Sequence, residues 1–439
     1  TYVNQTLVLR KTSEIDQIVR LESTVKSDSG LVFTNDWDIV KEEFFMNGES
    51  KFVETTPYSP LENKVSFIKN ILEKLGSYMR ESVEEEAPRQ FARLVKVLRM
   101  LKLDELKTVH KQFFGHSSTI PVEMKEKVDD ILIDAVAMCG TNDCVKHLVH
   151  VIESGKISNA KAAMCLRKLQ SIRVVSPKMI ERLFRLTEED KCTKSVMVCQ
   201  AAYLSTGSLL RAICSPSQDK LAIASKKNTQ LPMCDREIKS EWIEKLFSRF
   251  ESCESELCRV TVLKTIGNAG IPETLYKLEK IIRNTQRQYT QNVRVEAILA
   301  TRILAKLTPR KVERVLMPVY MNKMEKPFVR MAAINKIIEC QPEKFIVDQI
   351  ARSLFNERSR QVSSFAFTAL NTMANSTNPC EKRFADDIKL SLRHARYTPS
   401  WKWMRQSKFL RAQWHSEKLN RGFAIDFNSI MGNYSAIPK

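Results

Sequence analysis

Apolar residues recur at helical spacing along most of this chain. Ile68, Ile71, Leu72, Leu75 and Met79 fall three or four residues apart, as on one face of an α-helix. The same spacing predicts helices over 88–102, 104–113, 122–138, 143–153, 159–171, 177–187, 192–204 and 237–250, with a polar loop over 215–235. At roughly 20 residues per helix and turn, residues 60–395 would hold about sixteen or seventeen helices.

Two interleaved series divide residues 260–395 into repeats. Each of four prolines is predicted to open a helix, because the amide that proline lacks would have no partner in a first turn: Pro272, Pro309, Pro342 and Pro379. Between them, a valine is followed four residues later by an alanine that lets a neighbouring helix approach: Val293 and Ala297, Val329 and Ala333, Val362 and Ala366. Units of roughly 35 residues bury their apolar faces by stacking, so the pattern predicts an α-solenoid.

Both ends of the chain carry a different pattern. Residues 1–56 hold short alternating apolar runs that predict a few strands, and the Pro-rich stretch at 55–60 marks a boundary. Helical spacing then continues over 57–395. Residues 396–439 form a basic, aromatic-rich tail in which Gly422–Phe427 predicts a strand of a further β region. Because the chain begins at Thr1 rather than at a methionine, we expect a fragment or a processed piece.

Charge adds a possible surface for partners. The chain has 70 basic and 51 acidic residues, a net charge of +19 that favours polyanionic or acidic partners unless an acidic region elsewhere balances it. The basic tail predicts a docking surface made of Arg393, Arg396, Lys402, Arg405, Lys408, Arg411, Lys418 and Arg421. Its tryptophans could also stack on single-stranded nucleic acid, although the repeats lack a fixed polar pair for reading bases.

Catalytic and metal-binding motifs are not found. The sequence has no phosphate-binding glycine loop, no Gly-x-Ser-x-Gly and no His-Glu-x-x-His, so we expect no enzyme activity. His147 and His150 lie on one predicted helix, and His110 and His116 flank an aromatic pair. No cysteine or carboxylate cluster accompanies them, so we expect no metal site.

Eleven cysteines and three sequons change the expected compartment. Cys139 and Cys144, like Cys253 and Cys258, are five residues apart, a separation that can meet disulfide geometry when turn residues intervene. A helix running through Cys253 and Cys258 would instead point them in different directions. Together with the glycosylation sequons, the cysteines favour a secreted glycoprotein. The sequons begin at Asn4, Asn375 and Asn433.

Several stretches resemble one protein family. Val262–Gly270 resembles the Leu-Lys-x-hydrophobic-Gly-Asn-x-Gly signature of the vitellogenin-type large lipid transfer proteins. This superfamily includes vitellogenins, apolipophorins, apolipoprotein B and the large subunit of microsomal triglyceride transfer protein. Cys139 with Cys144 resembles the family's short disulfide, which supports that pairing. Further segments resemble the strand closing its amino-terminal β-barrel, a late helix, and the opening of its next sheet: Val3–Leu7, Gln361–Phe365 and Ser435–Lys439.

The resemblance implies a mostly α fold, a two-layered α-solenoid or helical arch flanked by β segments of larger sheets that enclose lipid. It implies a secreted yolk precursor that carries lipid and stores nutrients, is taken up into oocytes, and needs no cofactor beyond bound lipid. Implied partners are phospholipid, triglyceride, a receptor of the low-density-lipoprotein-receptor type, the rest of the same precursor and a second copy of the chain. Nucleic acid is not expected.

Two alternatives stay open. One is lipid transport of the apolipophorin, apolipoprotein B or microsomal transfer protein type. The other is a basic α-solenoid adaptor or RNA-binding protein, which would keep free thiols, whereas a secreted carrier would have oxidised cysteines and glycans. Because each repeat helix carries one apolar stripe suited to burial against neighbouring helices, we expect the helices to brace a lipid carrier and to hold little lipid themselves.

Overall fold

The computed structural model describes residues 61–78, 84–114, 122–172, 175–214, 234–395, 397, 405–416, 418–419 and 421–431. The predicted strands within 1–56 and the boundary at residue 56 lie outside these residues. The amino-terminal helices are α2 (Leu61–Tyr78), α3 (Ala87–Arg99), α4 (Leu103–Phe114), α5 (Val122–Cys139), α6 (Asn142–Glu153), α7 (Asn159–Lys168), α8 (Pro177–Arg185), α9 (Glu189–Lys194) and α10 (Val196–Cys214).

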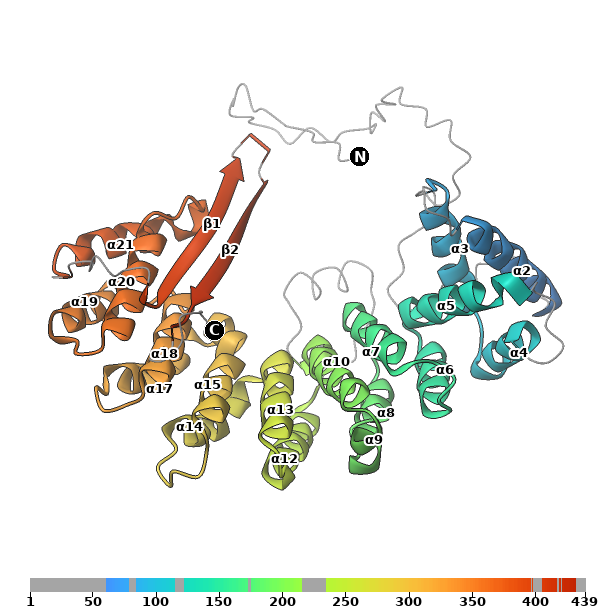
Figure 1. Cartoon of the computed structure of the whole chain (residues 1–439), viewed down its shortest axis with the longest axis horizontal. Helices are drawn as coiled ribbons and strands as arrows, with labels where there is room; N and C mark the ends of the chain where they lie inside the picture. Colours follow the sequence, from blue (N-terminus) through green and yellow to red (C-terminus); the bar gives the residue numbers. More distant parts are fainter. Residues whose placement is uncertain are drawn as a thin grey trace, which may run out of the picture. The chain divides into compact units, whose positions relative to one another are not determined.

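The remaining elements complete the helical stack and add a β-hairpin (Figure 1). The helices are α12 (Arg236–Ser252), α13 (Glu256–Ala269), α14 (Leu275–Arg283), α15 (Gln291–Leu299), α16 (Leu304–Leu307), α17 (Pro309–Met321), α18 (Pro327–Glu339), α19 (Lys344–Ser353), α20 (Arg360–Ala374) and α21 (Lys382–Leu392). Short 3-10 turns are η1 (Leu169–Ser171), η2 (Pro272–Thr274), η3 (Ala300–Arg302), η4 (Leu354–Asn356) and η5 (Pro379–Glu381). The strands are β1 (Lys408–Ser416) and β2 (Arg421–Ser429).

The helices form two layers. In the first layer each helix packs against the next, in the order α5, α7, α10, α13, α15, α18 and α20. The helices between them in sequence pack behind as a second layer, for example α14 on α15 and α17 on α18. The predicted mostly α, two-layered solenoid is therefore confirmed.

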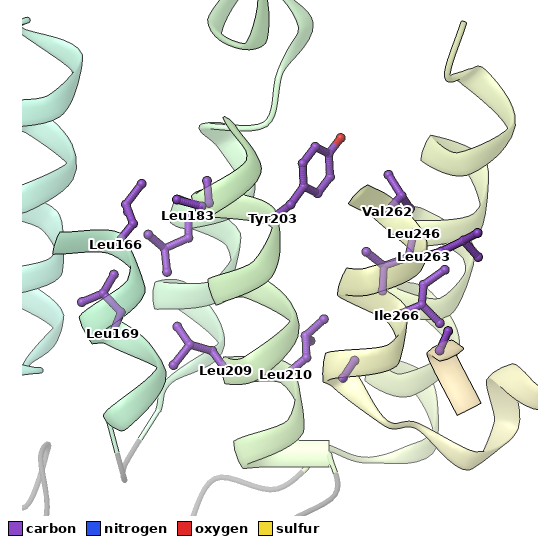
Figure 2. Close-up of a cluster of buried hydrophobic side chains, with 14 of the residues drawn as sticks. Leu166, Leu169, Leu183, Tyr203, Leu209, Leu210, Leu246, Val262, Leu263 and Ile266 are labelled. Carbon is purple, nitrogen blue, oxygen red and sulfur yellow. The ribbon is translucent and has the colours of Figure 1, made fainter. Parts of the chain in front are cut away.

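Leucine-rich contacts fill the space between adjacent helices. Figure 2 shows side chains of α7, α8 and α10 facing those of α12 and α13 across this core. Helix α10 is long and apolar enough to cross a membrane by composition alone, but it packs against α7, α8 and α13. The apolar residues of α10 therefore pack in the helical core. The buried residues in this view include Leu166, Leu183, Leu209, Leu210, Leu246, Val262, Leu263 and Ile266.

The predicted repeat occupies the first layer. Its valines and alanines lie on α15, α18 and α20 and are at most 1% exposed. Pro309 begins α17, whereas Pro272 and Pro379 begin the 3-10 turns η2 and η5 that lead into α14 and α21. Pro342 does not open a helix, contrary to the prediction. The chain turns at Gln341, whose φ is 48°, and the extended Glu343 then caps α19, so this helix begins at Lys344.

One predicted helix is wrong. The apolar spacing over 192–204 continues across a break, because α9 ends at Lys194 and α10 begins at Val196 and runs to Cys214. Ser195 lies between them, and its hydroxyl accepts a hydrogen bond from the Val198 amide at 3.4 Å. A serine that caps a first turn starts a new helix there.

The Gly-Asn-x-Gly signature is a helix junction. A side chain at Gly267 would bring its Cβ within 2.8 Å of the Ala300 Cα atom, so glycine allows α13 to meet η3. Asn268 donates a hydrogen bond to the Leu204 carbonyl of α10 at 3.2 Å and accepts one from Arg302 of η3. Gly270, with φ 59°, ends α13 in the left-handed conformation. The signature therefore ties α10, α13 and η3 together.

Buried arginines fasten successive repeats. Arg294 of α15 donates to the Ile282 carbonyl at the end of α14, at 3.0 and 2.8 Å. The same guanidinium donates hydrogen bonds of 2.9 and 2.6 Å to the carboxylate of Glu325, which lies in the loop of the next repeat. One arginine thus satisfies a helix carbonyl in its own repeat and pairs with a carboxylate in the following one.

The same contact recurs one repeat later. Arg330 of α18 donates to the Tyr320 carbonyl of α17 at 2.7 Å and to the Glu357 carboxylate at 3.0 and 2.5 Å. Its side chain is 3% exposed and that of Glu357 is 2% exposed. Burial alone would raise the pKa of Glu357, but the hydrogen bonds from Arg330 and from the Ser359 amide, together with the nearby positive charges, hold that pKa below its ordinary value. We call these two contacts the arginine clamps.

Candidate functional site at the β-hairpin

The hairpin has one apolar face. β1 pairs antiparallel with β2, placing Leu410 opposite Phe427, Ala412 opposite Ile425 and Trp414 opposite Phe423. Residues directly opposite in an antiparallel pair share a face of the sheet. We call these six residues the apolar hairpin face. Its large side chains are 48–55% exposed, and the rings of Trp414 and Phe423 stack with centroids 6.3 Å apart.

The opposite face of β1 is fastened to α20, beside which the hairpin lies (Figure 1). Phe409 is 4% exposed, and its amide donates to the Thr368 hydroxyl at 2.9 Å. The Gln361 side-chain oxygen accepts from the Ser407 amide and hydroxyl at 2.6 and 2.7 Å. Gln413 donates to the Asn375 carbonyl at 2.7 Å. Since side chains alternate along a strand, these contacts turn the apolar hairpin face away from α20.

An ion-pair network links the two strands to the helices. Arg411 donates to Glu381 of η5 at 2.8 Å and to Asp426 of β2 at 2.5 and 2.9 Å. The Arg411 side chain is only 9% exposed. This charge is therefore neutralised within the site, and it fixes the register of β2 against β1.

The comparisons identify the family. A model of the vitellogenin TPR domain family matches residues 62–371, which is more than half of the chain. The chain belongs to the vitellogenin family. Vitellogenin-6 of Oscheius tipulae is 31% identical over 426 residues, covering 97% of this chain and 25% of that protein. Vitellogenin-6 of Caenorhabditis elegans is 30% identical over 430 residues, covering 98% and 25%. The chain thus spans about a quarter of the length of these vitellogenins.

A solved structure shares the fold. The chain in a structure titled "lipid-protein interactions in lipovitellin" superposes with a TM-score of 0.71 at 22% identity, covering 87% of this chain and 38% of that one. Vitellogenin-A2 of Xenopus laevis is a further relative, 26% identical over 318 residues. The predicted resemblance to vitellogenins is confirmed.

In this vitellogenin-family chain, some residues of the predicted basic docking surface are buried. Lys408 is 8% exposed and Arg411 is held by two carboxylates, so neither is available as predicted. Arg411 lies on the face of β1 that α20 and η5 cover, whereas Lys408 is buried at the first position of the strand. Arg393, Arg405, Lys418 and Arg421 are exposed, whereas Arg396 and Lys402 lie outside the described residues.

The cysteines join consecutive helices of the vitellogenin fold. Disulfides link Cys139 to Cys144 and Cys253 to Cys258, with Cα atoms 6.2 and 5.6 Å apart. No helix runs through Cys253 and Cys258, because α12 ends at Ser252 and the Ser255 hydroxyl caps α13. Two further disulfides were not predicted: Cys192 to Cys199 and Cys214 to Cys234.

The break before Val196 explains one of the missed pairs. Residues seven apart in a single helix lie about 10 Å apart, too far for a disulfide. Once the helix is broken at Ser195, the Cα atoms of Cys192 and Cys199 are 4.9 Å apart. Cys165 and Cys340 remain as buried thiols and Cys380 as an exposed one.

The remaining candidate residues have separate settings. Asn375 is exposed at the end of α20, and Asn4 and Asn433 lie outside the described residues. His110 of α4 and His147 of α6 are buried with ring centroids 5.3 Å apart, and burial lowers the pKa of each to about 4. His150 is exposed, and His116 is not described. Within the described ranges, no group of three or more potential ligands could hold a metal.

Proposed function

We propose that this chain is the helical domain and the start of a lipid-facing sheet of a secreted, vitellogenin-like yolk precursor that carries phospholipid and triglyceride. The family membership supports this, and the lipovitellin structure that shares the fold concerns lipid–protein interactions in that protein. The observation that carries the proposal is the apolar hairpin face. Five large apolar side chains about half exposed on one face form a surface that water disfavours and that acyl chains or further apolar strands would cover.

The helices act as a brace in this proposal. Their valines and alanines are buried against neighbouring helices, which leaves the hairpin as the broad apolar wall. The α20 contacts hold that wall in a fixed orientation. No catalytic role and no cofactor beyond lipid enter the proposal.

Lipid contact is tested on the whole 439-residue chain. The triple variant Trp414→Ser, Phe423→Ser, Ile425→Ser removes the centre of the apolar hairpin face. A matched control changes exposed apolar residues elsewhere: Tyr276→Ser, Met324→Ser and Phe345→Ser. We expect wild type and control to float with triolein–phosphatidylcholine emulsion particles and the hairpin variant to stay in solution. Equal flotation of all three proteins would refute lipid contact through the hairpin.

The exposed basic residues are proposed as a docking surface for the acidic modules of a low-density-lipoprotein-type receptor, which would take the precursor into oocytes. Arg393, Arg405, Lys418 and Arg421 are the members that the structure leaves exposed. Exposed ion pairs are screened by salt, so receptor affinity should fall from low to high ionic strength. Receptor affinity unchanged by salt would contradict this docking surface, and tight RNA binding at physiological salt without binding of acidic proteins would favour the RNA-binding alternative.

A further inference from the structure

A cavity lies on the helical stack, separate from the hairpin. It has a volume of about 360 Å³ and is lined by the first turns of α10 and α13 and the last turn of α12. The disulfides Cys192–Cys199 and Cys253–Cys258 both contribute to its wall. Its size falls within the range of small-molecule sites, roughly 300–1,000 Å³. Two covalent links make this wall rigid before any ligand arrives.

Among the described residues, no carboxylate pairs with the guanidinium that lines this cavity. Arg249 donates to the Tyr203 hydroxyl at 2.7 Å and to the Thr187 carbonyl at 2.6 Å, and both partners are neutral. Figure 2 shows the Tyr203 side chain projecting from α10 on the side of α13, its hydroxyl directed away from the leucines. These two contacts fix the guanidinium in place. In the described chain Glu254 also lines the cavity, where it is exposed, while the hydrogen bonds of Arg249 go to the Tyr203 hydroxyl and the Thr187 carbonyl.

The helix ends add to this positive potential. The amino-terminal first turns of α10 and α13 contribute Val196 and Leu257 to the lining, and helix amino termini favour negative charge. A half-buried cation that contacts only neutral acceptors favours an anionic ligand as its counter-ion. Arg249 and the two helix termini therefore favour an anion in this cavity, against the negative charge of Glu254 at its wall.

The rest of the wall combines polar side chains, among them Gln200 and Thr261, with an apolar part. Val196 and Leu257 are each 54% exposed, so their side chains are open to whatever enters. The four half-cystines add further weakly polar surface. We propose that this cavity binds one fatty acid, with its carboxylate on Arg249 and its chain between Val196 and Leu257. The site is independent of the proposed lipid contact at the hairpin.

Calorimetric titration of the whole chain with decanoate tests the proposal. We expect one decanoate per chain at neutral pH, and weaker binding of decanol, which lacks the charge. Arg249→Met should lower decanoate affinity at least about tenfold, because a charge-assisted hydrogen bond contributes about 1.5–3 kcal/mol. Thermal unfolding shows whether the variant remains folded.

Two exposed positions keep the test decisive if Arg249→Met does not fold. Leu257→Asp places a negative charge at the wall and should abolish binding, while Leu307→Asp, at a site 50% exposed on α16, should leave binding unchanged. Glu254→Gln removes a negative charge and should tighten it. Decanoate binding that Leu257→Asp leaves intact would overturn the proposal. So would binding lost only in the hairpin triple variant, a result that would leave lipid contact at the hairpin standing.

Discussion

The two halves of the helical stack join their helices by different chemistry. From α5 to α13, four disulfides connect the end of one helix to the next helix or to the segment leading into it. From α14 to α20, the arginine clamps take this role, and the described residues of this half contain no disulfide. Covalent links tolerate acid but not reductant, whereas ion pairs tolerate reductant but not acid. The comparison therefore separates two kinds of stability within one fold.

The regular repeat of the second half explains where the arginine clamps occur. In the second half an arginine follows the repeat valine twice, at Arg294 and Arg330, and meets a glutamate in the next loop each time. In α20 the equivalent position is Ser363, and Gln361 bonds the chain that enters β1 instead. The clamp thus stops where the hairpin begins.

Removing a clamp should have the largest effect. Arg330→Met leaves the Glu357 carboxylate buried without its partner, which should cost about 3–5 kcal/mol of unfolding free energy. Urea unfolding followed by circular dichroism measures this loss. Arg330→Met combined with Glu357→Gln should recover part of it, because no unpaired charge remains. A loss below about 1 kcal/mol for Arg330→Met would show that the clamp does not hold the repeats together.

Removing a disulfide should have the next largest effect and act on the other half. The Cys214–Cys234 pair has a sequence separation of 20, so Cys214→Ser with Cys234→Ser should cost about 3 kcal/mol. The shorter loop of Cys139 and Cys144 should contribute about 2 kcal/mol or less. Hydrogen exchange of the wild type under reductant shows which helices lose amide protection. Loss of amide protection in α17–α20 rather than in α10–α13 would contradict the division.

Mild acid should weaken the first half before the second. The pKa values of His110 and His147 are about 4 in the folded chain, against 6.5 when unperturbed, so the unfolded chain takes up protons first. Each histidine should lower stability by about 2 kcal/mol as pH decreases from 7 to 5, and protonation of Asp129, whose pKa burial raises to about 6, should offset part of this loss. Burial would raise the pKa of Glu325 and Glu357, but hydrogen bonds from the clamp arginines and from backbone amides, with nearby positive charges, lower both, so their contribution is lost only below about pH 4.5.

Urea midpoints at pH 7 and pH 5 measure the histidine contribution. His110→Gln with His147→Gln should flatten the pH dependence, whereas the exposed His394→Gln should leave it unchanged. A pH dependence that survives the double substitution would place the acid-sensitive groups elsewhere.

The smallest effect should be confined to the hairpin junction. Gln361→Ala removes the acceptor of two hydrogen bonds from Ser407, a change worth about 1–2 kcal/mol. We expect faster hydrogen exchange over residues 407–412 and unchanged exchange in α15 and α18. Faster exchange throughout the stack would mean that the hairpin contact supports the repeats as the clamps do.

The sequence predicted local elements better than the contacts between them. Helices were found because apolar spacing is a local signal, and Gly422–Phe427 was found within β2 because its residues alternate. β1 was missed because Lys408 and Arg411 suggested an open basic tail, although Phe409, Arg411 and Gln413 already alternate with Leu410, Ala412 and Trp414. The partner of Arg411, Glu381, is 30 residues away, and spacing does not reveal such a pair.

The arginine clamps were not predicted from the sequence for the same reason. Arg294 and Glu325 are 31 residues apart, and Arg330 and Glu357 are 27 apart. Only the stacking of repeats brings each pair together. A search for arginines at equal repeat positions with a glutamate one loop later would have found both.

Quenching of Trp414 by brominated phospholipid tests most directly the central claim that the apolar hairpin face contacts lipid. Trp414 is 48% exposed on this face, whereas Trp242 is 3% exposed in the helical core. We predict that vesicles of brominated phosphatidylcholine quench part of the tryptophan fluorescence of the whole chain, and that Trp414→Phe removes this quenching while Trp242→Phe preserves it. Quenching that is absent from the wild type, or unchanged by Trp414→Phe, would contradict the account.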